Sequence, residues 1–208
     1  MTGLFSSPSS RRAVLGGAVG AGLTGAAITG PPVSAATALR MASTRYTSTT
    51  TYLTITGIKG DSNDVDHPGA IEISDFTFGD DVQLSIGKGG TADTGKSTAR
   101  PVRFSCLASQ ASPKLFLFCA QGRKLKTATL EVVGTPNGDG EPVAFFTAAL
   151  ENCVITSYDV SFASGDEGMR DEVELAYTRI SYTYRYLNDS DTPVPVTIGW
   201  DFSTNKSF

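Results

Sequence analysis

The sequence predicts a mainly β fold, an antiparallel β-barrel or sandwich with one short α-helix. Many short segments alternate apolar and polar residues at the two-residue period of a half-buried strand. The 208 residues include 22 glycines and 10 prolines, a composition suited to short strands joined by turns. A single segment carries both helix start and helix stop signals. The length suits one domain once a targeting segment is set aside.

The first 35 residues resemble a twin-arginine export signal. Arg11 and Arg12 precede a run rich in Ala, Gly and Val, and small residues at 33–35 give a cleavage point before Ala36. The apolar run is about 16 residues long, shorter than the roughly 20 needed to span a bilayer. We therefore expect a cleaved signal and no stable membrane insertion afterwards. A general secretory signal stays open as an alternative, because Gly16 stands where the twin-arginine consensus often has Lys.

Residues 36–50 are rich in Thr, Ser and Ala without a period, which predicts a flexible leader before a domain at 51–208. The first expected strand is 52–58. The next is 71–78, where the apolar phase changes and predicts a bulge near Ser74. Residues 87–97 are expected to form a Gly-rich loop, and strand character returns at 102–107.

The expected helix follows. Ser112 is a good N-cap, Pro113 suits the first helical position, and Gly122 can adopt the left-handed conformation that ends a helix. Leu115, Phe118 and Cys119 share one face at helical spacing. We expect this helix to cover an open end or side of the barrel.

Alternation then predicts a strand around 127–132, a hairpin loop at 136–140, and one or two strands within 143–158. The last long strand is expected at 172–186. Its phase slips near Thr178 and Arg179, which predicts a bulge that bends it. A final strand at 194–202 carries the single tryptophan, Trp200.

Charge and cysteines exclude several classes of function. The net charge is −4, and removing the first 35 residues leaves 15 basic and 21 acidic residues, a net charge of −6. Such a surface disfavours binding to nucleic acid or to anionic membranes. Cys106, Cys119 and Cys153 show neither disulfide nor zinc spacing, so we expect buried thiols that act as small apolar residues.

Residues 90–97 match the phosphate-binding pattern GxxxxGK[ST]. Such a loop needs a helix directly after its last residue, yet Pro101 and strand residues follow. We therefore expect neither nucleotide binding nor any other cofactor.

The acidic loop after the first strand offers oxygens at Asp61, Asn63, Asp64 and Asp66. It lacks the full calcium-loop pattern, so a solvated turn without a metal is expected. His67, the only histidine, has no nucleophile motif, and we expect a loop histidine paired with nearby acids. No residue is predicted to be catalytic.

Three tyrosines alternate along the last long strand, at Tyr182, Tyr184 and Tyr186. Such a stripe can stack on sugars, but tyrosines on barrel strands are more often packing residues with a polar tip. We expect packing and keep sugar binding as the alternative.

Four segments, in order, resemble the Hcp (hemolysin-coregulated protein) family of type VI secretion tube subunits. They are 55–67, which begins Ile-Thr-Gly-Ile-Lys-Gly-Asp-Ser, then 112–122, 172–184 and 199–201. The resemblance implies a β-barrel with one helix, six copies closing into a ring, and rings stacking into a tube. It implies a conduit, a holder of cargo or effector, or an exported marker, and not a catalyst.

The export signal departs from typical members, which carry none and assemble in the cytoplasm. We therefore expect a secreted or periplasmic homo-oligomer, with a monomeric binding module for glycans or a surface partner as the alternative. In the family the Gly-rich loop contacts neighbouring subunits. The candidate contact residues are this loop and the later hairpin: Gly87, Lys88, Gly89, Gly90, Gly95, Lys96, Asn137 and Gly138.

Overall fold

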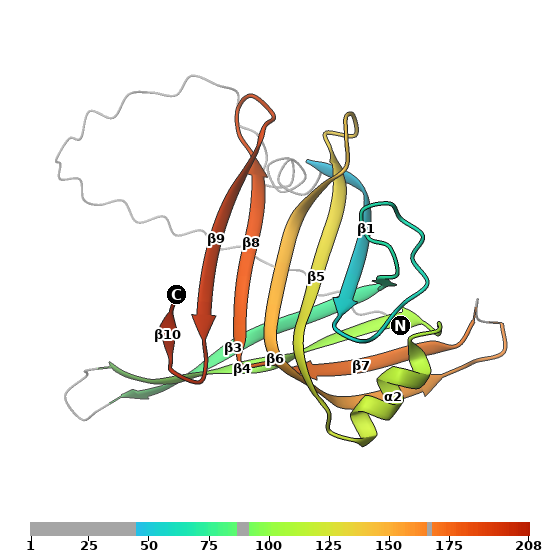
Figure 1. Ribbon diagram of the computed structural model, residues 1–208. Coiled ribbons are helices and arrows are strands. Elements are labelled where there is room, and N and C mark those ends of the chain that lie inside the picture. Colours follow the sequence, from blue (N-terminus) through green and yellow to red (C-terminus); the bar gives the residue numbers. More distant parts are fainter. Residues whose placement is uncertain (1–44, 87–91, 166–167) are drawn as a thin grey trace, which may run out of the picture. The chain divides into compact units, whose positions relative to one another are not determined.

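A computed structural model describes residues 45–86, 92–165 and 168–208. Within these residues the chain is mostly antiparallel strand with one short helix, as the sequence predicts (Figure 1). The elements are β1 (Tyr46–Ile55), β2 (Ile71–Glu72), β3 (Asp75–Ile86), β4 (Ala92–Leu107), α2 (Ser112–Ala120), β5 (Lys124–Pro136), β6 (Val143–Ser161), β7 (Arg170–Ala176), β8 (Arg179–Leu187), β9 (Pro193–Asp201) and β10 (Lys206–Ser207).

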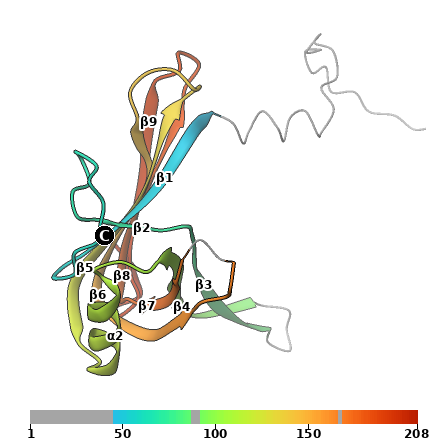
Figure 2. The ribbon, with the colours of Figure 1, turned by 90° about the vertical axis from the view of Figure 1, so that its right-hand side faces the viewer.

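The strands form two layers that share β6. The first layer has the order β10-β9-β8-β6-β5-β1-β2, and the second runs from β6 through β7 and β4 to β3. Figures 1 and 2 show β3, β4 and β7 crossing one end of the first layer. The other ends of β1, β5, β6, β8 and β9 extend beyond that crossing as a single layer.

β6 changes partner at Asn152. It pairs with β8 up to Glu151 and with β7 from Val154 onward. Asn152 has a φ of 54°, a left-handed conformation that asparagine tolerates better than most residues. The sequence left one or two strands open for 143–158, and the structure has one strand that turns from one layer into the other.

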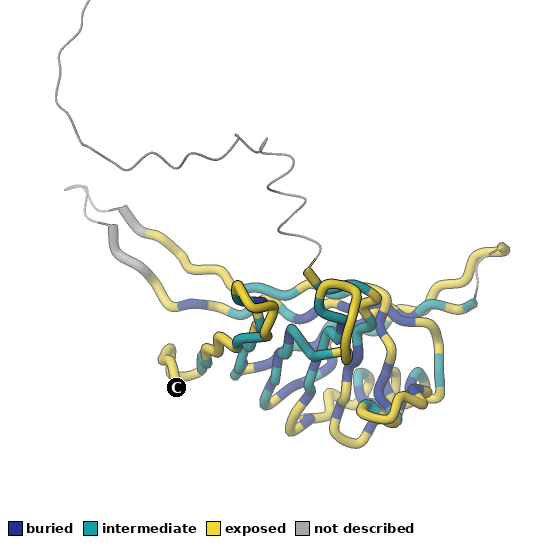
Figure 3. Tube along the Cα trace, turned by 90° about the horizontal axis from the view of Figure 1, so that it is seen from above, coloured by how far each residue is buried: buried dark blue, intermediate teal, exposed yellow. Residues whose placement is uncertain are grey.

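The core lies between the two layers. Leu53, Leu130 and Leu150 of the first layer face Val173 and Leu175 of the second, all of them buried in one apolar cluster. α2 adds Leu115 and Phe118 to this cluster beside β6, so the helix covers one side of the two-layer part. In Figure 3 the buried residues concentrate there, whereas the turns that join β5 to β6 and β8 to β9 are mostly exposed.

Two segments that were each expected to form one strand form two strands in the structure. The expected strand at 71–78 is split into β2 and β3, because the Ile73 amide donates to Thr51 in one layer and the Ser74 amide donates to Ser105 in the other. The expected strand at 172–186 is split into β7 and β8 at Tyr177 and Thr178, where the chain likewise changes layer. Both phase slips therefore mark a change of partner, and the expectation of bulges within single strands was wrong.

The expected strand limits also change at two places. β1 begins at Tyr46, inside the segment expected to be flexible, because residues 46–51 pair with the far end of β5. β4 begins at Ala92, so residues 92–97 of the expected Gly-rich loop are strand paired with β3. The short β10 was not expected.

The helix keeps its expected span but not its expected cap. Ala111 is the N-cap and makes no side-chain capping bond, while Ser112 is already helical. The Ser112 hydroxyl instead donates to Asp171 of β7. The helix ends as predicted, since Gly122 has a φ of 55° and its amide donates to Cys119.

Candidate assembly surfaces

The β3–β4 hairpin projects from the two-layer part as a two-stranded arm. β3 pairs with no strand other than β4 among the described residues, and β4 gains its second partner, β7, only from Val102 onward. We call the part from Gly79 and Arg100 to the tip the arm; it lies at the lower left of Figure 1. Val82 and Leu84, on one face of the arm, are 49% and 59% exposed.

The C-terminal turn supports the base of the arm. The Lys96 ammonium donates to the Ser203 carbonyl at 3.3 Å, and the Ser97 amide donates to the Asn205 side chain at 3.1 Å. Asp201 holds this turn by accepting from the Ser203 and Thr204 amides, and the Ser203 hydroxyl is the main cause of its lowered pKa. The arm is thus held at its base, and over its described residues its outer edges pair with no further strand.

The candidate contact residues fall on two separate hairpins. Gly95 and Lys96 lie on β4 in the arm, and Gly87, Lys88, Gly89 and Gly90 lie outside the described residues. Asn137 and Gly138 form the β5–β6 turn, with φ values of 49° and 80°, as a hairpin loop requires. Figure 1 places this turn at the opposite end of the domain from the arm, so the structure does not bring the two groups together.

The single-layer end of the first layer, which we call the wing, is polar on one face and apolar on the other. The wing comprises residues 46–50, 132–136, 143–146, 183–187 and 193–198. On the polar face the Thr183 and Thr197 hydroxyls bond to each other at 2.8 Å. The apolar face consists of Tyr46, Phe145, Tyr184, Tyr186, Val194, Val196 and Ile198.

Aromatic rings order this apolar wing face. Tyr46 stacks on Phe145 with ring centroids 4.3 Å apart, and Phe145 meets Tyr184 edge to face at 6.3 Å. Gly134 lies beneath them, where an added Cβ would come within 3.0 Å of the Phe145 ring. The glycine therefore leaves room for the rings to lie flat on the sheet.

The tyrosine stripe divides between core and surface. Tyr182 contacts Phe78 and Phe146, so the expectation of packing is confirmed there. Tyr184 also packs against Phe145, but Tyr184 and Tyr186 are 40% and 46% exposed and lie on the surface of the domain. Val196 and Ile198, which are 55% and 62% exposed, were not singled out from the sequence. The alternation of Val194, Val196 and Ile198 on the last strand was the available signal.

An apolar cleft of about 560 Å³ lies where the wing meets the base of the arm. Phe78 and Val82 line one side, and Tyr182, Ile198 and Trp200 line the other. The Trp200 indole N–H is buried and has no hydrogen-bond partner. The cleft therefore continues the apolar wing face toward the arm.

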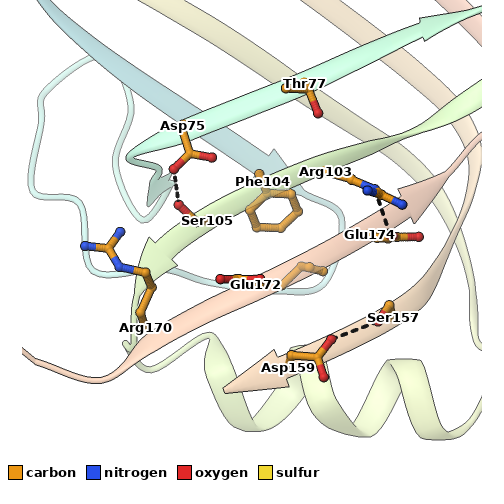
Figure 4. Close-up of a pocket in the computed structure, with 11 residues that line it drawn as sticks. Asp75, Thr77, Arg103, Phe104, Ser105, Ser157, Asp159, Arg170, Glu172 and Glu174 are labelled. Carbon is orange, nitrogen blue, oxygen red and sulfur yellow. Dashed lines mark hydrogen bonds and ion pairs between the residues drawn. The ribbon is translucent and has the colours of Figure 1, made fainter. Parts of the chain in front are cut away.

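A second cavity, of about 440 Å³, is polar and lies over β3, β4, β7 and the end of β6 (Figure 4). Arg103 pairs with Glu174 at 2.7 Å, and Ser105 donates to Asp75. No histidine or cysteine is among the residues that line it. Ser157 likewise donates to Asp159 at 3.1 Å, so the two serine hydroxyls of this cavity are each hydrogen-bonded to a carboxylate.

The acidic loop is a closed turn. One oxygen of Asp64 accepts from the amides of Asp66 and His67, at 3.0 and 2.9 Å. The His67 ring lies 3.0 Å from Asp64 and 3.4 Å from Glu131, and it stacks on Tyr52 with centroids 4.2 Å apart. The expected pairing of this histidine with nearby acids is confirmed. Within the described part of the chain, no group of three His, Cys, Asp or Glu residues is placed to hold a metal ion.

Two further features bear on the functions considered. Gly95, Lys96 and Ser97 are strand residues of β4, so the helix that a phosphate-binding loop requires directly after its last residue is replaced here by a strand. In the ranges that the structure describes, no helix has both the length and the apolar character needed to cross a membrane.

The chain matches one protein-family profile and several solved structures. A family profile described as "Type VI secretion system effector, Hcp" matches residues 52–184. Hcp1 from Salmonella typhimurium has a TM-score of 0.64 and 23% identity, over 77% of this chain and 99% of that chain. A structure described as a type six secretion system protein has a TM-score of 0.70 and 24% identity, over 76% and 99%. A type VI secretion system effector from Yersinia pestis has a TM-score of 0.56 and 19% identity, over 73% and 98%.

A search of curated proteins found no match. At these identities the solved structures establish the shared fold, and the family profile covers more than half of the sequence. The chain therefore belongs to the Hcp family of type VI secretion system proteins.

Proposed function

We propose that this chain is an exported structural subunit that assembles into homo-oligomeric rings, most simply hexamers, and acts without catalysis. One observation carries the proposal. The domain exposes two different apolar surfaces, the arm with Val82 and Leu84 and the wing face with Tyr184, Tyr186, Val196 and Ile198, and contiguous exposed apolar surface is typical of interaction sites.

Two different surfaces are what a ring requires. A contact between unlike surfaces repeats from one subunit to the next, and it closes when the rotation per step divides a full turn. A ring of this kind encloses a space that can hold a secreted effector or other cargo. Membership of a type VI secretion family supports the same role.

Export is part of the proposal and rests on residues 1–35. If Arg11 and Arg12 belong to a twin-arginine signal, replacing both by Lys abolishes export, because that pathway recognises the arginine pair. Fractionation of cells that produce the full chain measures this, with N-terminal sequencing of the exported protein to test a start at Ala36. Unchanged export of the double variant would point to the general secretory route.

Electron microscopy of the exported, processed protein tests assembly. Rings of uniform diameter, or tubes of stacked rings, are the expected particles. Fields that contain only particles the size of one subunit, at micromolar concentration, would refute the proposal.

A monomeric glycan-binding module is the second candidate, and the exposure of Tyr184 and Tyr186 favours it. The apolar wing face offers little to a sugar beyond stacking, since no carboxylate, amide or guanidinium side chain belongs to it. A glycan array separates the two: binding that is lost in Tyr184→Ala, from a protein with the mass of one subunit, would establish the module.

A further inference from the structure

We propose that residues 36–44 of each chain lie across the apolar wing face of the same chain and cover it before assembly. The inference rests on the proposed ring and deepens it, because it adds a contact that regulates when the wing becomes available. The side chains to be covered are Tyr184, Tyr186, Val196 and Ile198, which are 40–62% exposed. The covering side chains are Leu39 and Met41.

The described part of the chain begins on this face. Tyr46 stacks on Phe145, and its hydroxyl donates to the Arg185 carbonyl at 2.9 Å. The Arg45 guanidinium donates to the Leu187 carbonyl at 2.5 Å. Both carbonyls belong to β8, the strand that carries the exposed tyrosines. The segment before Arg45 therefore joins the domain beside the part of the face that remains uncovered.

The sequence of this segment suits an apolar sheet face. Leu39 and Met41 alternate with Arg40, the only charged residue in 36–44. Successive side chains of an extended chain point to opposite sides, so the two apolar side chains can contact the wing while Arg40 stays in water. The thioether of methionine also packs favourably against aromatic rings, which the wing presents as tyrosines.

The segment has the length to reach the exposed residues. Met41 lies four residues before Arg45 and Leu39 six, so an extended chain at about 3.3 Å per residue carries them about 13 Å and about 20 Å from it. Figure 1 shows β1, β5, β6, β8 and β9 side by side in that order. Neighbouring strands lie about 4.8 Å apart, which puts β8 about 14 Å and β9 about 19 Å from β1. Met41 can therefore reach the tyrosines of β8, and Leu39 can reach Val196 of β9.

Covalent connection favours the segment of the same chain over any other occupant. A segment joined directly to the face meets it at an effective concentration in the millimolar range, whereas separate subunits meet at micromolar concentration. A contact of equal strength is therefore about a thousandfold more favourable within one chain. A neighbouring subunit must offer more contact area to displace the segment.

This competition sets a threshold for assembly. The proposed ring uses the wing face, so each subunit that joins must give up its own covering segment. Below the threshold concentration the covered subunit is the stable form, and above it the ring is. The covered form keeps the apolar wing away from water and from unrelated proteins.

A disulfide between the segment and the wing tests the contact itself. Leu39→Cys with Val196→Cys places two thiols at the proposed contact. Leu39→Cys with Thr197→Cys is the matched control, because Thr197 is exposed on the opposite face. Both variants carry Cys119→Ser to remove the partly exposed native thiol. In dilute, reduced, processed protein, we expect oxidised glutathione to form the 39–196 disulfide within one chain and not the 39–197 disulfide.

Mass spectrometry and a non-reducing gel distinguish the outcomes. Equal yields of disulfide in the two variants, or no disulfide in either, would overturn the inference. Disulfides that join two chains would overturn coverage by the same chain and would assign the segment to the wing of a neighbour.

Light scattering over a concentration series tests the regulatory step separately. Leu39→Ser with Met41→Ser should lower the concentration at which rings first form by about tenfold or more, because two apolar contacts of the covered form are lost. Ser43→Ala with Thr44→Ala is the control and should leave the threshold unchanged. An unchanged threshold in the first variant would overturn the regulation. Processed wild-type protein that stays monomeric while the 39–196 disulfide forms would instead refute the proposed ring and support the contact.

Discussion

His67 lies between two carboxylates and flat against the Tyr52 ring. Its bond to Asp64 is the largest cause that lowers the pKa of that carboxyl from the ordinary value of 3.8. A carboxyl with a lowered folded-state pKa stabilises the fold above its unfolded pKa. That stabilisation is lost as the pH falls through the lowered folded-state value.

We therefore expect Asp64→Asn to reduce the free energy of unfolding at pH 7, and the difference from wild type to shrink as the solution is acidified below pH 3.8. Urea unfolding across this range measures it. A difference that stays constant on acidification would show that the ionised carboxylate contributes nothing.

The three thiols differ in access. Cys106 and Cys153 are fully buried, and burial raises their pKa values to about 12 and about 11. Cys119 on α2 is partly exposed. Because the thiolate is the reactive form, a thiol reagent should label Cys119 first in the native protein, and Cys119→Ser should remove the rapid phase. Rapid native labelling of Cys106 or Cys153 would contradict this packing.

Predictions about single residues were confirmed mainly where neighbours in the sequence determine the contact. The absence of disulfide and zinc spacing predicted three buried thiols, which is confirmed for Cys106 and Cys153 and wrong for the partly exposed Cys119. The acids beside His67 predicted its pairing. The stacking of Tyr52 on His67 was not predictable. This contact forms only because the loop after β1 folds back over the strand, and no local sequence pattern predicts that path.

α2 is fixed at its first turn by a buried carboxylate. Asp171 of β7 is fully buried and accepts from the Ser112 hydroxyl at 2.5 Å and the Tyr158 hydroxyl at 3.0 Å. Removing either donor leaves a buried acceptor short of a partner. We expect Ser112→Ala to lower the free energy of unfolding by about 1–3 kcal/mol, with Tyr158→Phe as a second variant. A loss within the error of the denaturation measurement in both variants would contradict this anchoring role.

Gly60 shows why the first family-like segment carries a glycine there. A Cβ at this position would lie 2.3 Å from the Ala70 carbonyl oxygen, a backbone atom that cannot turn aside. The Gly60 amide also donates to the Gly69 carbonyl at 2.8 Å. We expect Gly60→Ala to destabilise the fold by about 1–3 kcal/mol or more. Gly168→Ala is the control, because a Cβ there would lie 3.8 Å from the Leu107 side chain, an ordinary contact; equal unfolding midpoints for the two variants would contradict the account.

Element boundaries were the weaker part of the sequence-based prediction. The slips near Ser74 and Thr178 were visible as changes of parity, but a bulge and a change of layer give the same local pattern. Only the partners distinguish them, and those partners, Thr51, Ser105 and Glu151, lie far away in sequence. The start of β1 was missed because its Thr-rich residues gain order from pairing with β5.

At the scale of the whole molecule, the two-layer fold was predictable and its exposed surfaces were not. Alternating apolar residues on β8 and β9 have the same pattern whether a second layer covers them or not. Ile180 and Tyr182 lie under that layer, whereas Tyr184 and Tyr186 lie beyond its end. Only the topology shows where the second layer stops and the wing begins.

Light scattering of the exported, processed protein at micromolar concentration tests the central claim most directly. The account predicts a single species with several times the mass of one chain, six times for the simplest ring. A species with the mass of one chain over the whole concentration range would contradict it.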